Sequence, residues 1–162
     1  MSIKRNGMKA IIISVVCLLT GCANSPIVIS HMSPEELRSV DIKVLCHAHA
    51  AYTKNPGYFF QTKPRPPNKK IMAELLRRDT EGQNGGMPLF TDREWRLIGT
   101  RKVSVGMSEA ALICSWGLPD SCGGISHSSY GPTQYAYQSC EGYSSRFVYV
   151  EDGTVTDFSV FR

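Results

Sequence analysis

The chain has 162 residues, 42% of them hydrophobic, with 6 Cys, 9 Pro and 14 Gly. This length suits one small globular domain with an exported leader, and it excludes two large domains. The formal net charge is +4, but Lys4, Arg5 and Lys9 lie ahead of an apolar run that we expect to be removed. Without them, 15 basic residues stand against 14 acidic ones, so we expect no nucleic-acid partner.

Residues 1–21 have the three parts of a secretory signal peptide: a basic start, an apolar core at 10–19, and small residues before a cysteine. The core is too short to cross a bilayer, which takes about 20 apolar residues. The sequence Leu19-Thr20-Gly21-Cys22 resembles the lipobox of bacterial lipoproteins, so we expect Cys22 to be the acylated first residue of the mature chain. The alternative is an ordinary signal peptide in which Cys22 has no special role.

The residue after Cys22 is Ala23 and not Asp, which in the resembled Gram-negative lipoproteins implies sorting to the outer membrane. We therefore expect a protein that is lipid-anchored on the periplasmic side of the outer membrane. Several acyl chains hold a membrane stably, whereas one chain does so only marginally. Residues 22–32 are interpreted as a lipidated tether, with His31 in solvent.

Four mature cysteines remain, an even number in a compartment where disulfides form: Cys46, Cys114, Cys122 and Cys140. Three pairings are possible. Residues 120–126 and 134–140 flank a turn-rich stretch and predict a β-hairpin. If that hairpin is centred near Gly131, Cys122 faces Cys140 at a distance that suits a disulfide. Cys46 and Cys114 would then join the N-terminal region to the C-terminal one.

No metal, cofactor or catalytic residue is predicted. The chain has no Cys-x-x-Cys motif, and Cys46, His47 and His49 point in different directions on a helix. A Cys/His nucleophile pair is disfavoured because we expect each of the four mature cysteines to have a disulfide partner. The scattered histidines also lack the Ser, Asp or Glu company that hydrolytic catalysis needs. We therefore expect that the protein is not an enzyme.

Residues 33–99 are expected to be a helical N-terminal region. Ser33-Pro34-Glu35-Glu36 predicts a helix start, and apolar residues at helical spacing extend the prediction over 34–53. A second short helix is expected at 69–78. A capping box, Thr91-Asp92-Arg93-Glu94, predicts a third helix that carries Trp95.

The proline-rich stretch at 61–70 and the helix after it form the one local cluster of basic residues, at 63, 65, 69, 70, 77 and 78. Contact with anionic lipid headgroups beside the anchor is one interpretation, with Lys63, Arg65, Lys69 and Lys70 as the candidates. The alternative is a solvated loop and helix face.

Residues 100–162 have the strongest local signals. Ser108 as N-cap, Gly117 and Pro119 predict a helix at 109–116, with Trp116 as a large apolar anchor in its last turn. Residues 146–150 and 154–161 flank Asp152-Gly153, a strong hairpin signal. We expect an α+β fold, with helices packed on one face of a small three- to four-stranded antiparallel sheet.

The stretches Val105-Gly-Met-Ser-Glu109, Trp116-Gly-Leu-Pro-Asp120, Gln134-Tyr-Ala-Tyr137 and Phe147-Val-Tyr-Val-Glu-Asp-Gly-Thr-Val155 resemble the SmpA/OmlA (BamE-like) lipoprotein family. The resemblance covers about residues 100–160 and implies a small α+β module on the inner leaflet of the outer membrane. The family's best-known member is an accessory of the machine that inserts outer-membrane β-barrels. The added N-terminal region and the four mature cysteines depart from that member.

The leading hypothesis is a non-enzymatic lipoprotein that binds an envelope partner, in outer-membrane protein assembly or envelope integrity. The alternative is a periplasmic inhibitor or immunity-type binding protein, since small disulfide-stapled sheets present loops rigidly. Tyr130, in the loop at 127–133, and Trp116 are the candidate partner-binding residues.

Overall fold

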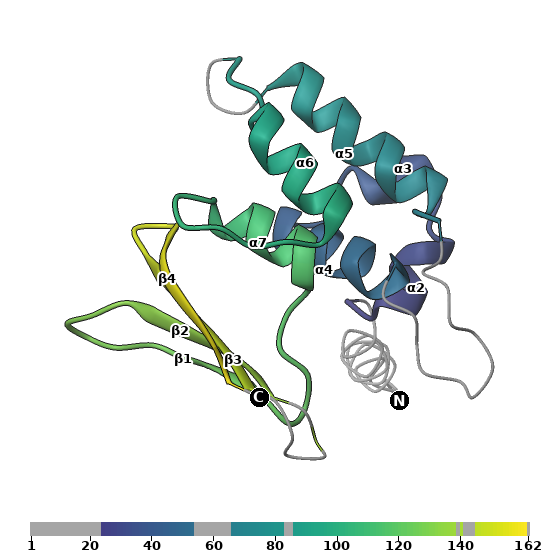
Figure 1. The fold of residues 1–162 in the computed structure, drawn as a ribbon. Helices are drawn as coiled ribbons and strands as arrows, with labels where there is room; N and C mark the ends of the chain where they lie inside the picture. The colour runs from purple at the N-terminus through teal and green to yellow at the C-terminus, as the bar shows by residue number, and fades with distance from the viewer. Residues whose placement is uncertain (1–23, 54–65, 83–85, 139, 141–144, 162) are drawn as a thin grey trace, which may run out of the picture.

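The computed structural model describes residues 24–53, 66–82, 86–138, 140 and 145–161. Those residues form six helices: α2 (Pro26–His31), α3 (Pro34–Leu37), α4 (Ile42–Thr53), α5 (Lys69–Glu81), α6 (Asp92–Thr100) and α7 (Glu109–Trp116). They also form four strands: β1 (Gly124–Ser126), β2 (Thr133–Gln138), β3 (Ser145–Glu151) and β4 (Thr154–Phe161). The helices lie on one side of a single antiparallel sheet, which confirms the predicted α+β class (Figure 1).

The helix predicted over 34–53 is wrong as one element, because the chain turns between α3 and α4. The capping box at Ser33 is present, as expected. However, the Ser39 hydroxyl donates to the Glu36 carbonyl, and Asp41 Oδ1 accepts the N–H of Lys43 at 2.8 Å. Short polar side chains that bond to the nearby backbone compete with helix continuation, so a new helix starts after Asp41.

The expected tether is also wrong over residues 26–32. Pro26 opens the short helix α2, and Ile29 on this helix is buried in the core. His31 is exposed, as expected. The folded domain therefore begins only a few residues after Cys22.

The other helix starts are also capped by side chains, and the caps of α6 and α7 are the predicted ones. Asn68 accepts the backbone N–H groups that open α5, and Thr91 and Glu94 form the reciprocal capping box of α6. Ser108 accepts the N–H of Ala111 at the start of α7, which ends at Gly117. At Gly117 the φ angle is 80°, in the left-handed region that glycine adopts without strain.

The sheet has the order β1-β2-β3-β4, with every neighbouring pair antiparallel. The β3–β4 connection is the two-residue turn Asp152-Gly153, with φ of 48° and 72°, as the hairpin signal predicts. A register shift between Tyr149 and Val150 coincides with a hydrogen bond from the Thr156 hydroxyl to the Tyr149 carbonyl. Such a bulge bends the strand and increases its twist.

One hydrophobic core runs from the helical region into the sheet. Leu45 on α4 and Leu112 on α7 are fully buried, and so are Val148 on β3 and Val155 on β4. Tyr135 lies directly opposite Val148 on the face that the helices cover. The helical region and the C-terminal module are thus packed as one unit.

Candidate functional site

The expected lipid anchor and two of the four expected headgroup-binding residues fall outside the described residues. Cys22, Lys63 and Arg65 are all in this group. Within the described part of the chain, no helix is long and apolar enough to cross a membrane.

The first disulfide joins the two halves of the molecule. Cys46 on α4 and Cys114 on α7 are both buried, and they are 68 residues apart in the sequence with Cα atoms 4.1 Å apart. The two helices pack against each other around this bond. It is the pair expected to tie the N-terminal region to the C-terminal module.

The second disulfide, between Cys122 and Cys140, closes the β1–β2 hairpin with Cα atoms 5.1 Å apart. The expected register, however, is wrong by two residues. Gly124 pairs with Ala136, so continuing the ladder places Cys122 opposite Gln138. Since a shift of two keeps both side chains on the same face, the bond forms along a diagonal just beyond the paired strands.

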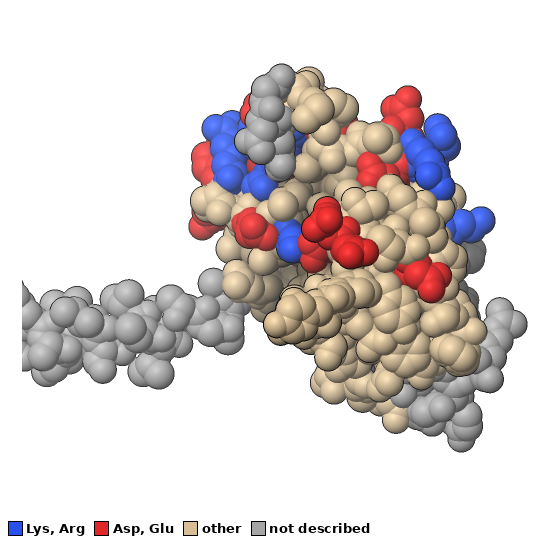
Figure 2. Space-filling model, turned by 90° about the vertical axis from the view of Figure 1, so that its left-hand side faces the viewer, with Lys and Arg blue, Asp and Glu red and all other residues tan. Residues whose placement is uncertain are grey.

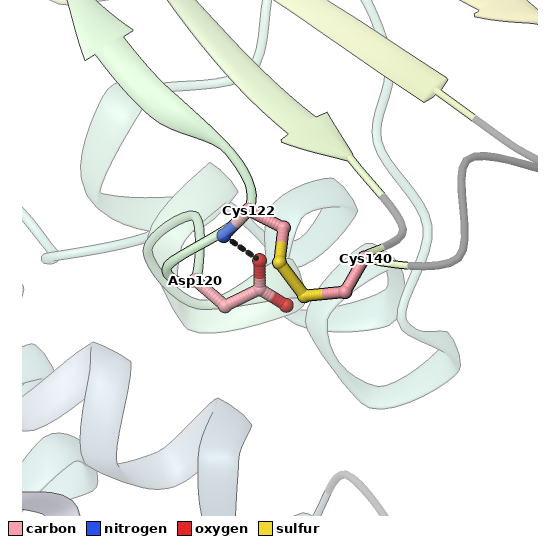
Figure 3. Close-up of side chains that lie close together, drawn as sticks. All are labelled: Asp120, Cys122 and Cys140. Carbon is pink, nitrogen blue, oxygen red and sulfur yellow. Dashed lines mark hydrogen bonds between the residues drawn. A yellow bond between two sulfur atoms is a disulfide. The ribbon is translucent and has the colours of Figure 1, made fainter.

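Asp120 lies beside this second disulfide (Figure 3). One oxygen of its carboxylate accepts the Cys122 backbone N–H at 3.2 Å. The carboxylate and the two sulfur atoms lie within 4.8 Å of one another, a spacing that could suit a metal ion. Because the two sulfurs are bonded to each other, Asp120 alone of the three offers a free ligand, and thiolates would be needed for zinc. We therefore interpret these three residues as a disulfide with a turn beside it, in which Asp120 holds the backbone of Cys122, and not as a zinc site.

Trp116 is half-buried and is held on three sides. Its indole N–H donates to the Arg101 carbonyl at 3.0 Å, and its ring meets the edge of Tyr137 with centroids 5.3 Å apart. The Arg146 guanidinium lies 5.3 Å from the same ring. The Tyr137 hydroxyl donates to the Gly117 carbonyl at 2.8 Å. Trp116 therefore acts as the clamp between α7 and the sheet, as an apolar anchor should.

Tyr130 has the opposite environment. It is fully exposed in the loop between β1 and β2. The loop is ordered by local contacts: Ser128 Oγ accepts the Tyr130 N–H at 3.3 Å, and His127 Nδ1 lies 3.2 Å from Thr133 Oγ1. Of the two candidate partner-binding residues, only Tyr130 exposes its whole ring to solvent.

Sequence reasoning missed a second exposed apolar surface, which we call the β4 strip: Phe158, Val160 and Phe161, with exposed fractions of 39%, 50% and 60%. Phe158 lies opposite Val148 on the face toward the helices, whereas Phe161 is on the other face, where its ring lies 6.0 Å from that of Phe147. The strip therefore wraps around the edge of the sheet. Its sequence signal is that apolar residues occupy both faces of one strand.

The backbone edge of β4 is partly closed by its own neighbours. Val155 exchanges backbone hydrogen bonds of 2.8 Å with Gly106 and Met107, and Asp157 Oδ1 accepts the Phe158 N–H at 2.8 Å. Such devices disfavour the addition of a further strand. The exposed side chains of this edge are therefore better suited to a contact than its backbone is. Among the residues drawn in colour in Figure 2, the charged side chains lie over the upper and middle parts of the face, and the lower part is tan.

A polar link connects the helices to the sheet. Lys43 on α4 donates to Glu109 on α7 at 2.8 Å, and the Tyr135 hydroxyl on β2 donates to the same carboxylate. Burial alone would raise the pKa of Glu109, but these two hydrogen bonds outweigh it and hold the pKa below its usual value. Three elements are thus held by one charged group.

Two of the four described members of the basic cluster are paired with a carboxylate. Arg77 and Arg78 both donate to Glu74, and the Arg77 hydrogen bond is the main reason that the pKa of Glu74 falls to about 2. Lys69 and Lys70 are exposed at the start of α5. Together with Arg38 and Arg77 they border a groove of about 300 Å³ between α3 and α5.

Two of the histidines, His47 and His49, lie in the fold beside α7 and in the core. His47 Nδ1 accepts the Leu118 N–H at 2.9 Å, which fixes the chain just after α7. His49 is buried, and burial together with the charge of Arg101 lowers its pKa. Each of these contacts supports the fold, and neither places a base beside a nucleophile.

Comparisons with known protein families, with curated proteins and with solved structures found no match to this chain.

Proposed function

We propose that this chain is a non-enzymatic lipoprotein of the outer membrane, anchored through acylated Cys22 and facing the periplasm, where it binds an envelope protein. Its role would be that of an accessory in outer-membrane protein assembly or envelope integrity. The resemblance of residues 100–160 to the SmpA/OmlA family supports this role, and the lipobox supports the anchor.

The observation that carries the proposal is the pair of disulfides in one small domain. Disulfides persist in the periplasm and on cell surfaces and are rare in reducing compartments. Cys46–Cys114 and Cys122–Cys140 use all four cysteines that would remain after acylation of Cys22. This use of the cysteines fits an exported chain, as the leader predicts, and it leaves none of these four thiols free for catalysis.

Two surfaces are suited to a protein partner: the Tyr130 loop and the β4 strip. Exposed aromatic side chains on a rigid scaffold lose little conformational entropy on binding and often dominate interface energies. Both surfaces belong to the disulfide-closed sheet, so neither needs to be ordered when a partner arrives. The near-neutral charge of the mature chain also disfavours nucleic acid.

Site-specific photocrosslinking in intact cells tests this proposal. A photoreactive residue placed at Tyr130 or at Phe161 should give a discrete crosslink to an envelope protein. The same residue at Met87, which has an exposed fraction of 69% but lies in the helical region, is the matched control. Crosslinking at Met87 alone, or at none of the three positions, would contradict the assignment of the partner surface to the sheet.

The inhibitor or immunity-type alternative is favoured by one observation, the full exposure of Tyr130 at the tip of an ordered loop. Insertion of such an aromatic side chain into a concave site is a common way to block an enzyme. The crosslinked protein distinguishes the two functions. A barrel-assembly subunit supports the accessory role, whereas a lytic enzyme captured through Tyr130 supports inhibition.

A further inference from the structure

Helix α2 presents an apolar face to solvent at the point where the folded domain begins. Ile27 and Val28 have exposed fractions of 72% and 40%, and His31 on the same side of the helix is also exposed. Ile29, on the opposite side of this short helix, is buried in the core. Helix α2 is thus attached to the core through Ile29, and its two neighbouring aliphatic side chains are left open to solvent.

This face has a fixed orientation relative to the rest of the molecule. Besides the burial of Ile29, the Asn68 side chain donates to the Ser30 carbonyl at 3.1 Å, and Lys70 Nζ donates to the Met32 carbonyl at 3.3 Å. The start of α5 thus holds the end of α2. Whatever contacts Ile27 and Val28 therefore also orients the domain.

The distance along the chain places α2 close to the membrane. An acylated Cys22 would lie at the lipid surface, and Pro26 follows it by four residues. A fully extended chain spans at most about 3.6 Å per residue, so α2 would begin within about 14 Å of the anchor. That distance reaches no further than the headgroup layer and its immediate surroundings.

We infer that the outward face of α2, formed by Ile27, Val28 and His31, rests on the phospholipid surface beside the anchor and orients the domain. The inference depends on the proposed acylation of Cys22. Aliphatic side chains on one face of a helix enter the boundary between headgroups and acyl chains, and nearby cations add attraction to anionic lipids. Lys69 and Lys70 supply those cations beside α2.

This arrangement has a consequence for the partner surface. In Figure 1 α2 lies on the right of the molecule, whereas the β1–β2 hairpin projects at the far left. A domain that rests on α2 would hold the tip of that hairpin, with Tyr130, away from the lipid. The membrane contact and the protein contact therefore use opposite ends of the fold.

The first test uses the unacylated mature chain, with Cys22→Ser, and vesicles of phosphatidylethanolamine and phosphatidylglycerol. The double variant Ile27→Asn/Val28→Asn should reduce vesicle partitioning about tenfold. The matched control Phe158→Asn/Val160→Asn, which removes a similarly exposed apolar pair from β4, should leave it unchanged. Equal partitioning of the two variants, or a larger loss in the β4 variant, would overturn the inference. Non-reducing gels and circular dichroism check that both variants fold.

The second test uses the acylated protein in vesicles that contain brominated phospholipid, which quenches nearby tryptophan. Tryptophan introduced by Ile27→Trp should be quenched several-fold more than tryptophan introduced by Val160→Trp, on the shared background of Trp95 and Trp116. Equal quenching would overturn the inference, even if the unacylated chain binds vesicles too weakly to measure. A chain that carries no acyl group would contradict the proposed function, and the first test would still decide whether α2 contacts lipid.

Discussion

The helical region before residue 100 and the module at 100–162 differ in how the sequence determines their elements. In the module, local signals determine the elements: Ser108 caps α7, Gly117 ends it, and Asp152-Gly153 turns β3 into β4. In the helical region, local caps also open α3, α5 and α6, but the way these helices are joined depends on contacts that are distant in sequence, such as Asn68 with Ser30. In our proposal the two regions also make different contacts, the first with the membrane and the second with a protein.

Removal of a disulfide should have the largest effect on stability, and the two disulfides differ in which regions they join. In the chain-entropy model a bond that spans 68 residues stabilises the fold by about 4 kcal/mol, and one that spans 18 residues by about 3 kcal/mol. We therefore expect Cys46→Ala/Cys114→Ala to be more destabilising than Cys122→Ala/Cys140→Ala. Denaturant unfolding under oxidising conditions measures both. A larger loss from the hairpin pair would mean that the two regions are not joined mainly through α4 and α7.

Trp116 and Tyr130 provide the next contrast. Trp116→Ala should lower the free energy of unfolding by about 3 kcal/mol, because the ring and its hydrogen bond to Arg101 are both lost. Tyr130→Ala should change stability by less than about 0.5 kcal/mol, since the side chain is exposed. Among folded molecules, Tyr130→Ala should reduce crosslinking to the partner more than Trp116→Ala does. Similar effects of both variants on stability would contradict the separation of scaffold from contact residue.

His49 gives the helical region a pH dependence. Its pKa is lowered from 6.5 by burial and by Arg101, so the unfolded chain binds the proton more readily than the folded one. Stability should therefore fall as the pH drops below that value, and His49→Gln should reduce the fall. The comparison uses unfolding midpoints measured at about pH 7.5 and about pH 5.5. Glu94 and Glu109, whose pKa values are lowered in the fold, take up protons only below this range. An equal fall in wild type and variant would exclude His49 as its source.

The smallest expected effect concerns the break between α3 and α4. Asp41→Ala removes the side chain that accepts the first N–H groups of α4 and should cost about 1 kcal/mol. Asp41→Asn, which keeps an accepting oxygen, is the conservative control and should cost much less. Hydrogen exchange at Lys43 and Val44 reports the cap directly. Unchanged protection of these amides in Asp41→Ala would show that tertiary packing alone positions α4.

Much of the module could be predicted because each of its signals acts within a few residues. The cysteine pairing was predicted together with a wrong register, since a diagonal across the hairpin is compatible with a disulfide as well as a direct pair. The break at Asp41 was not predicted, because the apolar spacing continues through it while a local side-chain bond decides the backbone. The packing of α2 depends on α4 and α5, and the strand pattern of 154–161 does not say which side is left uncovered.

The central claim is that a rigid, doubly disulfide-bonded domain is held at the membrane by Cys22. Intact-mass analysis of the protein extracted from cell envelopes, with the mature N-terminus identified by peptide mapping, tests it most directly. We predict a chain that begins at Cys22, carries acyl groups on that residue, and has Cys46 joined to Cys114 and Cys122 to Cys140. A mature chain that begins elsewhere, an unmodified Cys22, or free thiols at the four other positions would contradict the account.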